Sequence, residues 1–168
     1  MAANTVATPP AELSNDSIRE YAERVGRHHQ IYDENGRADI DGLVARLGGD
    51  VVVQDGPESM RVTAEGDFCI HLPTFTSERR DRFTKAHELG HYFLHYRYPG
   101  RTEPESFSRG GRSPAETQAN VFASSLLMPE DEFRAAHASA DGNVHRLAHR
   151  FEVSPAAAKV RSEVLGLV

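Results

Sequence analysis

The sequence predicts an α+β fold in which a small antiparallel sheet of about three strands packs with helices. Three observations predict this class. Apolar residues recur at helical spacing over 14–49, short β-rich segments separated by Gly and Pro fill 50–73, and helical patterns dominate the rest of the chain. With 168 residues, 39% hydrophobic and 26% charged, the chain is long enough for one globular domain with its own core.

Residues 1–13, which include two consecutive prolines, are expected to form a disordered leader. The remainder, 14–168, is expected to be a single domain. Apolar spacing predicts one helix over about 17–30, and a second between Asp39 and the glycine pair at 48–49. Both helices are interpreted as scaffold.

Three strands are expected within 50–73, and the last two form a hairpin around Glu65-Gly66 that leads directly into the next helix. If the last strand is the edge of the sheet, its unpaired backbone groups can pair with an extended peptide. His71 on that strand is therefore a candidate substrate-binding residue, although a lone His on a strand is more often an ordinary surface residue.

A His-Glu-x-x-His motif, with His87 and His91 flanking Glu88, lies in a helical pattern over 77–96. On an α-helix, positions four residues apart differ by about 40° and lie one turn apart, so both imidazoles can bind one zinc ion from the same side. Glu88 is offset in angle and can reach a water on the metal, which suits a general base. Apolar residues fall on the opposite side, so the helix is expected to pack on one face and to expose the motif on the other.

Two other histidine patterns show how specific this motif is. His145 and His149 share the four-residue spacing, but Arg146 stands where the base would be, so this pair is expected on a solvated face. His95 extends the row of motif histidines, but eight residues at ~1.5 Å rise place it about 12 Å from His87, too far to bind the same ion. It is a candidate for substrate binding or for closing the end of the helix.

The third metal ligand must come from elsewhere in the chain. Residues 97–113 are rich in Gly, Pro, Ser and charge, and are interpreted as a flexible loop that could act as a flap. A helix is predicted over 114–128, and spacing leaves two roles open for its Glu116: the third ligand, or a capping residue that satisfies a backbone N–H at the helix start. Glu103 and Glu105 are weaker candidates, because a flexible loop positions a ligand poorly.

Three segments share a pattern that is more specific than any of them alone: Phe-Thr-x-Ala-His-Glu-Leu-Gly-His at 83–91, Glu-x-x-Ala-Asn-x-Phe-Ala-x-x-Leu-Leu-Met-Pro at 116–129 and Leu-Ala-x-x-Phe-x-Val-Ser at 147–154. In these segments the chain resembles the ImmA/IrrE family of zinc metallopeptidases, over about 50–168. The resemblance implies a compact gluzincin-like fold, a Zn2+ cofactor and Glu116 as the third ligand. It also makes Asn120, one helical turn further on, a candidate hydrogen-bond partner for a ligand histidine.

The expected function is that of a zinc-dependent endopeptidase, with Glu88 as general base. The resemblance implies that its substrate is a separate helix-turn-helix transcriptional repressor. Two other interpretations stay open: a zinc-bound regulatory module that binds a repressor without hydrolysing it, and a helical domain with incidental histidines and no metal. A second electrophile would help hydrolysis, and the residues that qualify are Tyr92, Tyr96, Tyr98, His71 and His95, of which the last three are also the candidates for substrate binding.

The remaining features limit partners and compartment. A formal charge of −6 argues against direct nucleic-acid binding. The helical subdomain predicted over 130–168 has nearly balanced charge around 151–154, which favours packing over a DNA-binding role.

The single Cys69 excludes an internal disulfide and suits a reducing cytosol. No long apolar segment or secretory leader is visible, so the protein is expected in the cytoplasm and not in a membrane. No oligomeric state is predicted.

Overall fold

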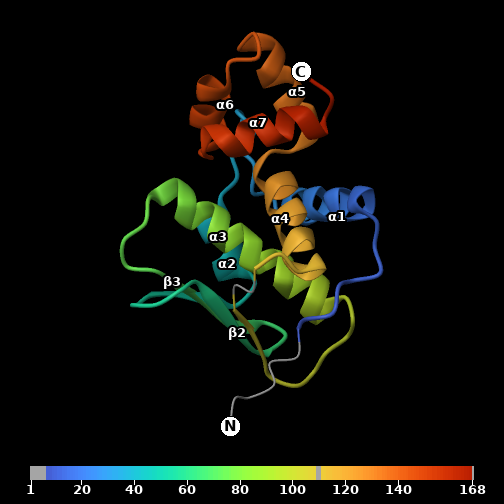
Figure 1. The fold of residues 1–168 in the computed structure, drawn as a ribbon, viewed down its shortest axis with the longest axis vertical. Helices are drawn as coiled ribbons and strands as arrows, with labels where there is room; N and C mark the ends of the chain where they lie inside the picture. Colours follow the sequence, from blue (N-terminus) through green and yellow to red (C-terminus); the bar gives the residue numbers. More distant parts are fainter. Residues whose placement is uncertain (1–6, 109–110, 168) are drawn as a thin grey trace.

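The computed structural model of the chain describes residues 7–108 and 111–167, and it confirms the α+β class. The sheet lies at one end of the molecule, helices α5 to α7 lie at the opposite end, and α1, α3 and α4 lie between them (Figure 1). The elements are α1 (Asn15–His28), α2 (Ile40–Arg46), β1 (Gly49–Val53), β2 (Ser59–Ala64), β3 (Asp67–Leu72), α3 (Glu78–His91), the π-helical turn η1 (Tyr92–Arg97), β4 (Glu105–Ser108), α4 (Pro114–Leu127), α5 (Glu130–Ser139), α6 (Val144–Phe151) and α7 (Pro155–Val164).

The sheet has four strands in the order β1-β3-β2-β4 and is mixed, whereas the sequence predicts about three antiparallel strands. β2 and β3 form the expected antiparallel hairpin, β1 runs parallel to β3, and β4 runs antiparallel to β2. The prediction of a loop over 97–113 is therefore wrong for Glu105–Ser108. These residues become a strand because β2 offers them an unpaired edge, and local sequence carries no signal for such a distant partner.

The strand that precedes the motif helix, β3, is an interior strand and not an edge. It pairs with β1 on one side and with β2 on the other, so β1 and β4 are the two edges of the sheet. Pairing of an extended peptide with β3 is therefore excluded. Along β3 the side chains alternate: Phe68, Ile70 and Leu72 are buried in the core, and Cys69 and His71 belong to the opposite face.

The helix predicted over 77–96 is present, but it changes type within its length. Ser77 caps its N-terminus by accepting a hydrogen bond from the backbone N–H of Arg80. The α-helical part ends at His91 and continues as the π-helical turn η1, in which the N–H of Tyr98 donates to the carbonyl of Phe93 at 2.9 Å. Such wide turns are rare and often occur at functional sites.

Helices α3 and α4 approach each other closely where Gly90 meets Ala119. A Cβ atom built on Gly90 would lie 3.0 Å from both the Cα and the carbonyl oxygen of Ala119. The absence of a side chain at position 90 therefore brings the two backbones together. This contact places the first turn of α4, with Glu116, opposite the motif histidines on α3, and Figure 1 shows the two helices side by side.

The C-terminal helices form a small cap whose apolar residues pack inward. Leu147, Ala148 and Phe151 of α6 are at most 1% exposed, as is Val153 in the following turn, which agrees with the packing role expected for this region. The side chain of Arg82 on α3 donates to the carbonyl oxygens of Ala38 and Glu152 and so ties the cap to the central helices. No helix in the described parts of the chain combines the length and the apolar character needed to cross a membrane.

The segment before α1 contacts the domain. Residues 1–6 of the expected leader lie outside the described residues. The backbone of Ala11, however, exchanges two hydrogen bonds with the side chain of Gln118 on α4, and Leu13 packs against the core. The chain around Ala11 therefore lies on the domain and is not free of it.

Candidate metal centre

Three side chains from two helices converge at one point of the structure. His87 and His91 come from α3 and Glu116 comes from α4. Glu116 Oε2 lies 3.0 Å from His87 Nε2, and Glu116 Oε1 lies 2.9 Å from His91 Nε2. Among the described residues, these three form the group of side chains that could hold a metal ion, with all ligand atoms within 4.8 Å of one another.

The spacing and the hydrogen bonding of these atoms fit a cation. Two ligands of a tetrahedral zinc ion, each about 2.0–2.1 Å from it, lie about 3.3 Å apart. Nδ1 of His87 lies 2.7 Å from Oδ1 of Asn120, which accepts its N–H, so Nε2 keeps a lone pair. That Nε2 is buried, and it has no hydrogen-bond partner among the described atoms. A lone pair facing a carboxylate is unfavourable unless a positive ion lies between them.

Of the two roles that its spacing leaves open, the side chain of Glu116 takes the position of a metal ligand and not that of a helix cap. Its backbone N–H donates to the Ser113 side chain, which caps α4, while its carboxylate faces the two imidazoles. Burial would raise the pKa of this carboxyl, but the interactions with His87 and His91 in their protonated forms outweigh burial and hold the pKa below its usual range. Glu116 is therefore an anion at neutral pH, as a metal ligand must be.

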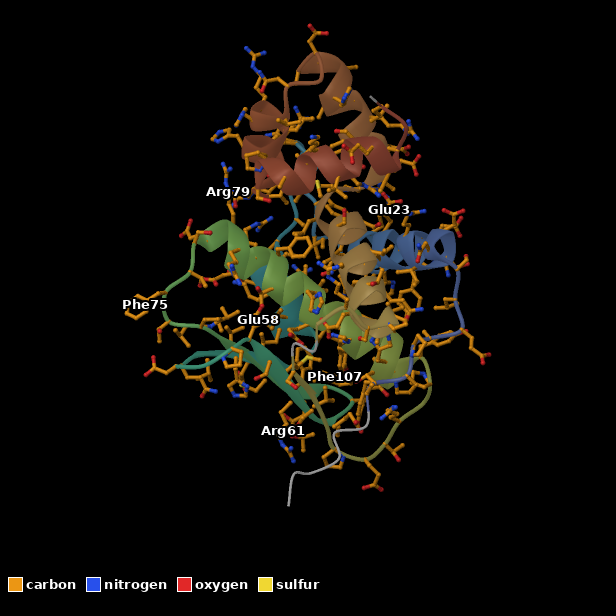
Figure 2. All side chains as sticks on the ribbon, in the orientation of Figure 1. Glu23, Glu58, Arg61, Phe75, Arg79 and Phe107 are labelled. Atoms are coloured by element: carbon orange, nitrogen blue, oxygen red, sulfur yellow. The ribbon has the colours of Figure 1, made fainter. Side chains whose placement is uncertain are left out.

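The motif face is buried, and the expectation that it faces solvent is wrong. His87, Glu88 and His91 are 7%, 1% and 2% exposed. The cause is tertiary: α4 covers one side of α3, and Phe107 of β4 covers another. The Phe107 ring stacks on the His91 ring at 5.2 Å between centroids and 15° between planes. Figure 2 shows Phe107 between the sheet and the helices.

His95 lies behind His91 and not in contact with the cavity, so the structure contradicts a direct role in substrate binding. It is 2% exposed, and both of its ring nitrogens are engaged. Nδ1 lies 2.8 Å from Nδ1 of His91, and Nε2 lies 2.9 Å from Oε1 of Gln118. Of the three histidines along the helix, His87 and His91 are the candidate ligands, and His95 lies against His91 as a hydrogen-bond partner.

The buried His95 makes the stability of the metal-free protein sensitive to acid. Burial, partly offset by the hydrogen bond to Gln118, lowers the pKa of His95 from 6.5 to about 4. Because the folded-state pKa lies below the unfolded one, the contribution to stability is complete above about pH 6.5 and is lost as the pH falls toward about 4. We expect His95 to account for a loss of about 2 kcal/mol in the free energy of unfolding between about pH 7.5 and pH 5.

Urea unfolding of the chelator-treated wild type and of His95→Gln at these two pH values checks this prediction. The Gln amide can accept from His91 and donate to Gln118 without titrating, so the variant should lose this part of the pH dependence. Equal pH dependence in the two proteins would contradict a depressed pKa at His95.

A cavity of about 410 Å³ opens beside the metal centre at His87. It lies between α3, the chain before β2 and the start of α7, and Asn120 also lines it. Figure 2 shows Glu58 by the sheet and Arg79 near the C-terminal cap, on two sides of this region. The segments 83–91, 116–129 and 147–154 contain several of these residues, but no local motif predicts that they line one cavity, because they come from separate elements. They are Glu58, Ser77, Arg79, Arg80, Phe83, Thr84, His87, Asn120, Ser154 and Pro155.

The other residues singled out from the sequence lie away from this cavity. His71 is on the face of the sheet opposite the core, near Ser59 and Cys69. Tyr98 is 49% exposed at the end of η1. The hydroxyl of Tyr92 accepts from the N–H of Gly66, and Tyr96 is buried against Tyr92. Glu105 forms an ion pair with Arg101. His145 and His149 are both exposed to solvent.

Comparison with known proteins supplies one match. The family model described as the IrrE N-terminal-like domain, Peptidase M78, matches residues 52–163, which is more than half of the chain and includes every residue of the convergent group. No individually curated protein matches the chain.

Proposed function

The chain belongs to the Peptidase M78 family of IrrE N-terminal-like domains, and from this premise we propose that it is a zinc-dependent endopeptidase that cleaves another protein. The observation that carries the proposal is the meeting of His87, His91 and Glu116 within 4.8 Å. Two imidazoles and one carboxylate are a ligand set of catalytic zinc sites, which keep one coordination position open. Among the described residues, no fourth protein ligand joins the three.

The residues of the chain have separate roles in the proposed reaction. When bound, zinc supplies a Lewis acid that lowers the pKa of a water ligand toward ~7 and polarises the scissile carbonyl. Glu88 follows His87 directly on α3 and is 1% exposed, so its carboxylate is shielded from bulk water. Glu88 takes the proton of the attacking water and delivers it to the leaving amine. Asn120 holds His87 with Nε2 toward the metal.

The substrate is proposed to bind as an extended segment beside β4. This strand is a sheet edge, with β2 as its neighbour on the inner side, so its outer backbone groups can pair with a peptide. Its Phe107 touches the ring of His91, which places that edge next to the metal centre. The family resemblance supports a separate helix-turn-helix repressor as the protein that is cleaved, and a cytoplasmic location where such a repressor would be found.

Incubation of the zinc-loaded protein with the purified repressor encoded at the same locus tests the proposal. Fragments detected by mass spectrometry that disappear with a chelator, and return with added zinc, are the expected result. A stoichiometric complex without fragments would instead favour a zinc-bound regulator that binds a repressor without hydrolysis. A protein that retains no metal would contradict both.

A further inference from the structure

We propose that Ala11, Gln118 and His95 form a hydrogen-bond relay that holds the ring proton of His91 on Nδ1, and so keeps Nε2 available to the metal. This inference rests on the metal site proposed above and adds two positioning residues, His95 and Gln118, together with a segment of the chain far from the motif. It assigns the segment before α1 a direct part in metal affinity.

The first step fixes the orientation of the Gln118 amide. The backbone N–H of Ala11 donates to Gln118 Oε1 at 2.9 Å, and Gln118 Nε2 donates to the carbonyl oxygen of Ala11 at 2.8 Å. If the amide were flipped, its NH2 group would face the N–H of Ala11 and its oxygen would face the carbonyl oxygen of Ala11. Neither hydrogen bond could then form. The backbone of Ala11 therefore determines that Oε1, an acceptor, faces His95.

The second step follows from the distance of 2.9 Å between that Oε1 and Nε2 of His95. Because Oε1 can only accept, the hydrogen must be on Nε2 of His95. A neutral imidazole carries one N–H, so Nδ1 of His95 is left as an acceptor. Gln118 is 9% exposed and His95 is 2% exposed, so water does not replace these partners.

The third step concerns the two Nδ1 atoms of His91 and His95, which lie 2.8 Å apart. One hydrogen fits between them, and it belongs to His91 because Nδ1 of His95 must accept. Nε2 of His91 then presents its lone pair at the position 2.9 Å from Glu116 Oε1. Asn120 accepts the N–H of His87 Nδ1 and so likewise leaves Nε2 of His87 with a lone pair. Helix α4 therefore supplies the ligand Glu116 and also orients both imidazoles.

Replacing Gln118 by a residue without an acceptor should change which ring nitrogens of His95 and His91 carry the protons. A buried N–H without a partner costs about 1–3 kcal/mol, so in Gln118→Met the proton of His95 should move to Nδ1. It would then donate to His91 and drive the His91 proton onto Nε2, the metal-binding atom. Outer partners of metal ligands typically contribute 10–100-fold to affinity, and we expect zinc affinity to fall by about that factor.

Zinc competition against a chromophoric chelator measures this effect in wild type, Gln118→Met and a matched control. The control is Tyr32→Phe, which removes a different buried hydrogen bond to α4, from the Tyr32 hydroxyl to the carbonyl of Leu126 at 2.7 Å. It should lower stability and leave zinc affinity within about twofold. Equal affinities in wild type and Gln118→Met would overturn the relay alone, whereas a wild type without zinc affinity would overturn the proposed function.

The N-terminal arm of the relay has its own test. Ala11→Pro in the full chain lacks the backbone N–H that donates to Gln118 Oε1, so the Gln118 amide turns more easily and zinc affinity should fall. Gln118→Glu in the Ala11→Pro protein offers an acceptor in either orientation, and it should restore most of the affinity. An Ala11→Pro protein with wild-type affinity would overturn the role of Ala11. A failure of Glu at position 118 to restore affinity would show that the loss comes from altered packing and would overturn the role of proton placement.

Long-range proton–nitrogen NMR spectra of the zinc-free protein read the proton positions directly. Wild type should show His91 protonated on Nδ1 and His95 on Nε2, and Gln118→Met should show the reverse at both rings. His95→Gln identifies the His95 signals. A wild-type His91 with its proton on Nε2 would contradict the proposal whatever the zinc affinities are.

Discussion

A Glu88→Gln protein is expected to keep its zinc and to lose about two to four orders of magnitude in the rate of repressor cleavage. The amide has nearly the same size as the carboxylate and preserves the packing of a residue that is 1% exposed. It cannot accept a proton, so the attacking water loses its base while His87, His91 and Glu116 remain in place. Zinc content and cleavage rate, measured on the same preparation, separate these two effects.

The matched control for this variant is Glu78→Gln, a change of the same chemistry at an exposed position in the first turn of the same helix. It should leave both zinc content and cleavage rate unchanged. If Glu88→Gln cleaves the repressor at the wild-type rate, Glu88 is not the base. If it loses its zinc, its role is structural support of the metal centre.

Glu116→Ala is expected to lower zinc affinity by at least about 100-fold, more than the loss of an outer hydrogen-bond partner would. The substitution removes a charged oxygen ligand and leaves two neutral imidazoles to hold the ion. It also leaves those buried imidazoles without the carboxylate that faces them at 2.9–3.0 Å. Competition with a chelator measures the affinity, and cleavage should be lost with the metal.

Ser113→Ala separates the capping of α4 from metal binding by Glu116. It removes the side chain that caps α4 and accepts the backbone N–H of Glu116, at a cost of about 1 kcal/mol in stability, and it leaves the carboxylate in place. We expect reduced stability with retained zinc affinity. A Glu116→Ala protein that behaves like Ser113→Ala, less stable but still binding zinc tightly, would show that Glu116 is a capping residue and would leave the centre without its third ligand.

Local spacing was sufficient for the parts of the site that lie within one helix. His87 and His91 are four residues apart, and an α-helix places them on one side whatever surrounds it. Their ring centroids lie 4.9 Å apart in the structure. The N-caps Ser77 and Ser113 are also local signals, because each side chain bonds an N–H three residues on.

Local spacing did not predict the features that depend on contacts with distant segments of the chain. The role of His95 depends on Gln118 and Ala11, and a strand at 105–108 exists because β2 has a free edge. Burial of the motif depends on α4 and on Phe107. In each case the contacts join residues well separated along the chain, and the periodicity of a single segment contains no information about its partner.

The sequence by itself determined that this chain carries two imidazoles and an adjacent carboxylate at the spacing of a metallopeptidase motif, since that arrangement depends only on helix geometry. The family resemblance implies Glu116 as the third ligand, but only the tertiary structure shows that its carboxylate meets the imidazoles and which partners place their ring protons. The physical reason is that both depend on how closely α4 approaches α3 at Gly90, and on hydrogen bonds that form only when segments more than a hundred residues apart, Ala11 and Gln118, come together.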